Sequence, residues 1–255
     1  MNNLIEAKHG TGIEAIIAGM TPTRPDERKI PATNSPFPEL REQYERLREK
    51  HGSLYLPQIV NLVHNEVRSV LTPTEINIFL QSTVTSEHRD NYADFTGIFI
   101  SRLIQNSYDD GNNNFSFNLD MLQPIHHLGY QVQGTTKKIL KVKIKGIAGD
   151  WCGSSVLFSQ FSIETVKDLC GSDAQHSKFN LKTAEDLLGY IARDSQFSTE
   201  TVGNRASYDT FHNQFSTPRE ETVQRLLHII PEGNQIIFLH PDGTPKIVRD
   251  YNDLN

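Results

Sequence analysis

The two cysteines of the chain, Cys152 and Cys170, stand eighteen residues apart. If the residues between them form one coil of a stacked structure, their Cα atoms lie about 5 Å apart, within the range of a disulfide. One hypothesis is therefore a redox pair. The other is a pair of small apolar side chains in a column that Leu188 and Ala206 continue, because a buried free cysteine behaves as a small hydrophobic residue. We favour the second interpretation, with a disulfide between Cys152 and Cys170 as the alternative.

A second set of reactive side chains has the same spacing. Phe158 is followed, at intervals of eighteen residues, by His176, Asp194 and His212. Histidine beside a carboxylate can bind zinc or transfer protons. However, three coils span about 10 Å at ordinary strand spacing, whereas zinc holds each ligand at about 2 Å. We therefore expect exposed polar side chains in this column, with neither a metal nor a cofactor.

The remaining candidates for chemistry have simpler interpretations. His126 and His127 are adjacent in an expected loop, where neighbouring side chains point apart, so we expect one exposed and one packed ring. Residues 109–114 (DDGNNN) offer oxygen ligands but lack the spaced carboxylates and the final glutamate of an EF-hand loop, which favours a turn. The sequence contains no Walker loop, no Gly-x-Ser-x-Gly, no His-Glu-x-x-His and no Cys-x-x-Cys. We assign no catalytic residue.

The cysteines and histidines belong to a longer repeat with a period of eighteen residues. Its clearest column, the expected repeat core, consists of Phe161, Phe179, Phe197 and Phe215. Two residues before each phenylalanine stand Ser159, Ser177, Ser195 and Asn213. Three more columns keep the same register: threonines at 165, 183 and 201, glycines at 153, 171 and 189, and Asp or Asn eleven residues before each phenylalanine. Chance does not explain five columns in one register.

The pattern inside each repeat predicts its structure. From Ser159 to Thr165, small or apolar residues alternate with polar ones, which is typical of a half-buried strand. Eighteen residues are too few for a strand and a full helix, but they suit one coil of a β-solenoid. The phenylalanines would then stack inside, and the serines would form an internal polar ladder. An antiparallel meander is the alternative, but it gives no reason for positions to recur at a constant interval, so we predict a parallel solenoid of about four coils.

An earlier strand precedes the repeat, where Lys141, Lys143 and Lys145 alternate with apolar residues. Counting back one repeat from Phe161 leads to Lys143, so this strand is offset by one residue. Because a slip of one residue turns every side chain to the other face, we predict a bulge or a longer first turn here. A basic patch for anions is one interpretation of the lysines, and a solvated strand face is the one we favour.

The run from Val142 to Gly153 (VKIKGIAGDWCG) resembles the coils of the GXGXG-type right-handed β-helix, found at the end of the glutamate synthase large subunit and in a formylmethanofuran dehydrogenase subunit. The similarity covers about residues 139–217, and the later coils keep the aspartate and one glycine but not the Gly-x-Ala-Gly run. The resemblance implies a right-handed coil and a scaffold role, as in a non-catalytic subunit of a larger complex. The whole chain also resembles uncharacterised archaeal β-solenoid proteins, which implies no activity.

The segments around the repeat complete the expected fold, an α+β protein in which a helical N-terminal domain precedes a short β-solenoid. We expect a flexible proline-rich tail at 1–36 with a short helix at 13–18, a helical domain at 37–119, the solenoid at 120–217 and a capping helix and hairpin at 218–255. Helix signals include Pro57 followed by apolar residues as far as Val70, and the aromatic stripe around Phe95 and Phe99. Capping boxes are predicted at 72–75 (TPTE) and 217–220 (TPRE), and a hairpin turn at 241–244 (PDGT).

Composition limits the function. The chain has 255 residues, a net charge of −6, 36% hydrophobic and 22% charged residues. The acidic balance argues against a general nucleic-acid binder, and the absence of a long apolar run argues against a membrane protein, so we expect a cytoplasmic protein. We predict a structural or protein-interaction module that displays a rigid solenoid surface. The alternatives are a carbohydrate-acting or other small-ligand enzyme that uses a solenoid face, and the non-catalytic subunit named above.

Overall fold

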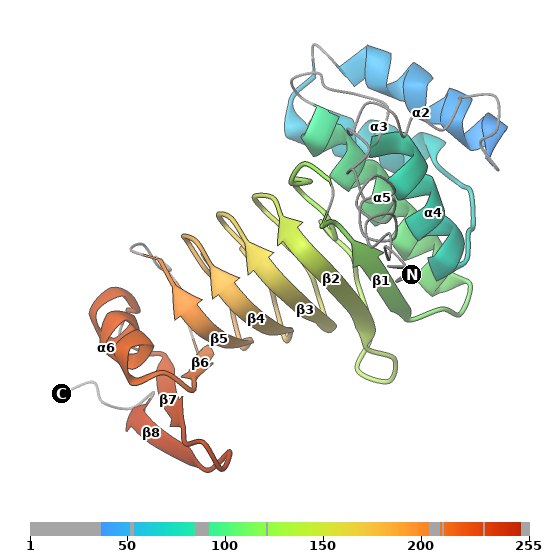
Figure 1. Cartoon of the computed structure of the whole chain (residues 1–255). Coiled ribbons are helices and arrows are strands. Elements are labelled where there is room, and N and C mark those ends of the chain that lie inside the picture. Colours follow the sequence, from blue (N-terminus) through green and yellow to red (C-terminus); the bar gives the residue numbers. More distant parts are fainter. Residues whose placement is uncertain are drawn as a thin grey trace, which may run out of the picture.

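The computed structural model describes residues 37–51, 54–84, 92–120, 122–203, 210, 212–231 and 233–250. The tail expected at 1–36, with its short helix, lies outside these residues. Helices gather at one end of the molecule, a row of parallel strands leads away from them, and a helix with a hairpin lies at the other end (Figure 1). The predicted α+β fold, a helical region followed by a β-solenoid, is confirmed.

The N-terminal helices are α2 (Pro38–His51), α3 (Leu56–Glu66), α4 (Pro73–Val84) and α5 (Tyr92–Asp109). The capping box before α4 is confirmed, since the Thr72 N–H donates to Glu75 Oε2 (2.8 Å) and the Glu75 N–H donates to Thr72 Oγ1 (3.3 Å). The apolar spacing beyond Pro57 is only partly helical, because α3 ends at Glu66 and Val70 lies outside it with 52% of its surface exposed.

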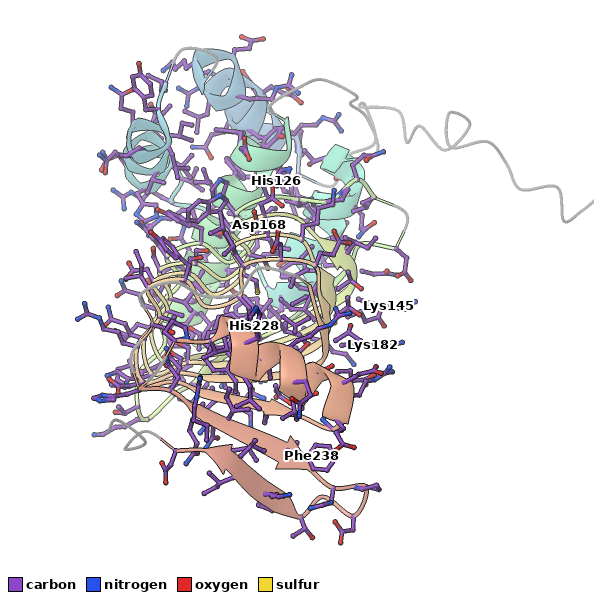
Figure 2. All side chains as sticks on the ribbon, turned by 90° about the vertical axis from the view of Figure 1, so that its left-hand side faces the viewer. His126, Lys145, Asp168, Lys182, His228 and Phe238 are labelled. Carbon is purple, nitrogen blue, oxygen red and sulfur yellow. The ribbon has the colours of Figure 1, made fainter. Side chains whose placement is uncertain are left out.

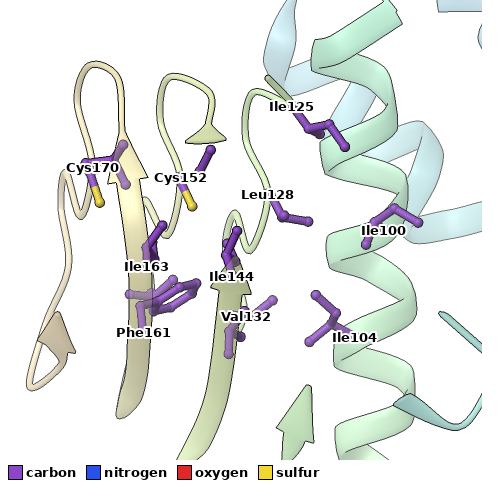
Figure 3. Packing of buried hydrophobic residues seen from close by; sticks show 14 of the residues in the cluster. Ile100, Ile104, Ile125, Leu128, Val132, Ile144, Cys152, Phe161, Ile163 and Cys170 are labelled. Carbon is purple, nitrogen blue, oxygen red and sulfur yellow. The ribbon is translucent and has the colours of Figure 1, made fainter. Parts of the chain in front are cut away.

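The helices share one core with the solenoid. Phe95 and Phe99 on α5 are fully buried, as the stripe predicts, and Tyr44 of α2 packs edge-on against the Phe99 ring with 5.1 Å between centroids. Figure 3 shows Ile100 and Ile104 of α5 facing Leu128 and Val132 of the first coil. The helical region therefore covers the first end of the coil stack with apolar side chains.

The sheet consists of β1 (Asn114–Asn118), β2 (Leu140–Ala148), β3 (Ser159–Val166), β4 (Lys178–Ala184), β5 (Gln196–Val202), β6 (Gln214–Thr217), β7 (Gln235–Leu239) and β8 (Pro245–Arg249). Strands β1 to β7 pair in chain order and in parallel, and only β8 is antiparallel to its neighbour. Identical repeat positions are direct partners, as for Phe161 with Phe179 and Phe179 with Phe197. This register excludes the antiparallel meander.

The predicted bulge between the lysine strand and the repeat is present. Val142 pairs with Phe161 and Ile144 with Ile163, but the register shifts before Ile147, which pairs with Thr165. Gly146 lies within the shift, with a φ of 91°, a conformation that favours glycine. One extra residue in β2 therefore brings its apolar side chains onto the same inner face as the phenylalanines.

The C-terminal region departs from the sequence prediction in one detail. Helix α6 (Glu220–Ile229) begins after Arg219, with no side-chain cap, so the capping box at 217–220 is wrong. Thr217 is the last residue of β6 and is fully buried, and its hydroxyl accepts a hydrogen bond from the Arg219 N–H (3.2 Å) instead. The predicted hairpin is present as β7 and β8, and β7 also continues the parallel sheet beside β6.

Candidate interaction surface

The interior of the solenoid holds its surface rigid. The rings of the four repeat-core phenylalanines, Phe161, Phe179, Phe197 and Phe215, stack with centroids 5.2, 5.0 and 5.2 Å apart and interplanar angles of 9°, 8° and 13°. All four rings are buried. The glycine column is explained by the same stack, because a Cβ on Gly171 would lie 2.8 Å from the Phe197 ring. The predicted internal stack is therefore confirmed.

A polar ladder runs beside the stack, as predicted. The N–H of Ser159 donates to Ser177 Oγ (3.1 Å), that of Ser177 to Ser195 Oγ (3.2 Å), and that of Ser195 to Asn213 Oδ1 (2.9 Å). The ladder extends one step further than the repeat indicates, since the Asn213 N–H donates to Asn234 Oδ1 (3.0 Å). Each buried N–H in the column therefore has a partner in the next coil.

The two cysteines lie in adjacent coils as free thiols, both fully buried. Figure 3 places them among the apolar side chains of the core. Burial raises the pKa of the Cys152 thiol to about 12 and raises that of Cys170 well above its ordinary value, in the latter case with a smaller contribution from Cys152. Both thiols are therefore poor nucleophiles in this environment.

The column of His176, Asp194 and His212 is on the surface. His176 stacks on the Phe158 ring at 5.2 Å and 11°, and His212 Nδ1 lies 3.9 Å from Asp194 Oδ1. The side chains of His212 and Asp194 are 74% and 51% exposed. Among the described residues, no group of three histidine, cysteine or acidic side chains is arranged to hold a metal ion.

The two adjacent histidines lie where the helical region meets the first coil. His126 is half-buried, and its Nδ1 accepts a hydrogen bond from the Asp150 N–H (2.9 Å). His127 is packed, with its ring stacked on Trp151 at 6.2 Å and its Nε2 3.6 Å from Asp94 Oδ1. Its Nδ1 is buried and makes no hydrogen bond with the described residues. Burial lowers the pKa of His127, opposed in part by Asp94.

We expect this histidine to make the fold sensitive to acid. The pKa of His127 is lower in the folded chain than its ordinary value of 6.5, so its contribution to stability is complete above about pH 6.5 and is lost as the pH falls below it. Urea unfolding at about pH 7.5 and about pH 5.5 should show a smaller loss of stability for His127→Asn than for the unchanged chain. The exposed His176→Gln is the control, and an equal acid loss in all three proteins would contradict the assignment.

The loop at 109–114 is a turn, as expected. The backbone N–H groups of Asp110 and Gly111 donate to the carbonyls of Asn106 and Tyr108, and Gly111 has a φ of 121°. The turn carries the chain from the end of α5 directly into β1, the first strand of the sheet.

The face of the sheet that points away from the phenylalanine stack is polar over most of its length. We define the outer polar face as two columns of register partners that alternate with the buried phenylalanines. The first column is Asn114, Lys141, Gln160, Lys178, Gln196 and Gln214. The second column is Ser116, Lys143, Ser162, Asn180, Ser198 and Ser216. Neither column contains a carboxylate, so this face combines amide and hydroxyl groups with three lysines.

A third outward column, beside the outer polar face, balances its own charge. Lys145 forms an ion pair with Asp120, and Glu200 lies 3.5 Å from Arg219. Lys182 stands on β4 between the strands that carry Glu164 and Glu200. In Figure 2, Lys145 and Lys182 project from the same side of the solenoid. The uncompensated charge therefore belongs to the two neighbouring columns.

The outer polar face is hollowed at its N-terminal end. A depression of about 330 Å³ lies over β1, β2 and β3, lined by residues that include Lys141, Lys143, Gln160 and Ser162. Lys141 and Lys143 are exposed, as expected for a solvated strand face. Their pairing with neutral residues on β1 and β3 is what alternation along β2 alone does not show. A signal for this surface is present in the sequence, because the alternate positions of each repeat carry no acidic residue here, whereas Glu164 and Glu200 stand one column away.

Comparisons of the chain with protein-family models, with curated proteins and with solved structures found no match. Within the part of the chain that the structure describes, no helix is long and apolar enough to cross a membrane. The surface itself is therefore the basis for a functional conclusion.

Proposed function

We propose that this chain is a protein-interaction module that presents the outer polar face of its β-solenoid to a partner protein. One observation carries the proposal: amide, hydroxyl and lysine side chains, with no carboxylate, repeat along two columns of a parallel sheet, one residue per strand in each column, over β1 to β6. Neighbouring strands lie about 4.8 Å apart, so the face offers a regular array of hydrogen-bonding groups.

The stacked core supports this role because it limits the movement of the face. Strands β2 to β6 each pair with a strand on both sides, and the buried phenylalanine stack runs through β3 to β6 with the serine ladder beside it. A surface that is ordered before binding loses less conformational entropy when a partner docks. The resemblance of residues 142–153 to a scaffold β-helix is consistent with a non-catalytic subunit of a larger complex.

Native mass spectrometry of the protein, purified gently from its own cells, tests the proposal. We expect a stable complex with another chain, and a bare 28.9 kDa monomer would contradict it. The double variant Ser162→Glu/Ser198→Glu, which places two larger, negatively charged side chains on the face, should lose the partner. The control is Gln175→Glu, an exposed position in an isolated β-bridge outside the named strands, and it should keep the partner.

A further inference from the structure

We propose that the β1–β4 end of the outer polar face binds an extended acidic protein segment, with Asp or Glu side chains at alternate positions opposite Lys141 and Lys143. The inference rests on the proposed function and names the chemistry of the partner.

The charge of the face is the first argument. Among the described residues, Lys141, Lys143 and Lys178 form no ion pair, in contrast to Lys145, which is paired with Asp120. Their register partners on the neighbouring strands are all neutral. These partners are Asn114 and Gln160 for Lys141, Ser116 and Ser162 for Lys143, and Gln160 and Gln196 for Lys178. In a chain of net charge −6, this end of the sheet is therefore a local concentration of positive charge.

Strand geometry is the second argument. Lys141 and Lys143 lie two residues apart on one face of β2, so their Cα atoms are separated by about 6.6 Å. An extended peptide places its own alternate side chains on one side at the same spacing. Two carboxylates at positions i and i+2 of a segment that runs along β2 can therefore meet both lysines together. The depression over β1, β2 and β3 gives such side chains room.

The same observations disfavour charged polymers. The two columns carry no arginine and no aromatic side chain, so nucleic-acid bases have no ring on which to stack. The lysines also stop at β4, and the columns continue as Gln196, Ser198, Gln214 and Ser216 without charge. A polymer with an anionic group on every unit would find cations along only part of this face. A short acidic cluster matches the surface better.

Fluorescence anisotropy with the full chain tests the inference. The probe is a labelled peptide of alternating Glu and Thr, and the control probe is the same peptide with Gln in place of every Glu. We expect saturable binding of the acidic probe only, weakened by added salt. Lys141→Gln/Lys143→Gln should reduce its affinity by about fivefold to tenfold, as expected for two exposed ion pairs. Lys182→Gln, between two glutamates, should change the affinity by less than about twofold.

Several results would overturn the inference. These are no saturable binding of the acidic peptide, equal binding by the double variant, or an equal loss in Lys182→Gln. Tighter binding of polygalacturonate or duplex DNA through the same lysines would assign the site to a different class of partner. If the complex captured from cells survives Lys141→Gln/Lys143→Gln, the proposal of an interaction module stands and the proposal of an acidic segment fails. If neither the complex nor the peptide binds, both proposals fail.

Discussion

Phe179→Ala is expected to lower the free energy of unfolding by about 3–5 kcal/mol. The Phe179 ring is fully buried, between Phe161 at 5.2 Å and Phe197 at 5.0 Å. Its removal costs the transfer energy of the ring and leaves a cavity that the two neighbouring rings cannot fill, because stacked strands hold them in place. The loss is measured by equilibrium unfolding in urea, followed by circular dichroism.

Two further variants make this result specific to the stack. Phe179→Leu keeps an apolar side chain of smaller volume and should cost about 1–2 kcal/mol. Lys178→Ala changes the adjacent exposed residue of β4 and should stay within about 0.5 kcal/mol of the unchanged chain. A loss of less than about 1 kcal/mol for Phe179→Ala would contradict close packing of the column.

Asn213→Ala should have the second largest effect, a loss of about 2–4 kcal/mol. The Asn213 side chain is fully buried and makes two hydrogen bonds: Oδ1 accepts from the Ser195 N–H (2.9 Å) and Nδ2 donates to the Ala192 carbonyl (2.8 Å). Truncation leaves a buried donor and a buried acceptor without partners, and each such group costs about 1–3 kcal/mol. Urea unfolding again measures the change.

The repeat itself supplies the matched variant for this test. Asn213→Ser introduces the residue that Ser177 and Ser195 place in the same column, where Oγ accepts the N–H of the preceding coil. It should therefore recover part of the stability that Asn213→Ala loses. Gln214→Ala, on the outer face one residue later, should have a much smaller effect. Equal losses for the alanine and serine variants would show that the ladder bond to Ser195 contributes little.

Much of the solenoid could be predicted from the sequence because its information is local and repeated. Alternation with a period of two identifies each strand, and a constant spacing of eighteen residues leaves parallel stacking as the arrangement that aligns Phe161 with Phe179. The same counting located the bulge in β2, since Val142 must share the inner face with the phenylalanines. The stack and the serine ladder follow from these two periods alone.

The candidate surface could be predicted only in part. The outward direction of Lys141 and Lys143 follows from alternation along β2. Their isolation from carboxylates depends on which residues pair with them on β1 and β3. The repeat alone does not give this pairing, because β1 lies outside the repeat and β2 joins it only through a bulge. Whether an exposed lysine is compensated is therefore a property of three strands together.

The sequence by itself determined the strands, their parallel order and the buried phenylalanine and serine columns, because each depends on side chains at fixed separations along the chain. The sequence also predicted helices at both ends of the solenoid and the final hairpin, but only the tertiary structure decided how these end segments join the stack. The insertion of α6 changes the spacing, so Asn234 joins the ladder and β7 joins the sheet 21 residues after their partners. The tertiary structure also assigns Thr217 to strand β6. At the other end of the stack, it buries His127 between α5 and the first coil. These features depend on contacts between segments with no common period, which a repeat cannot encode.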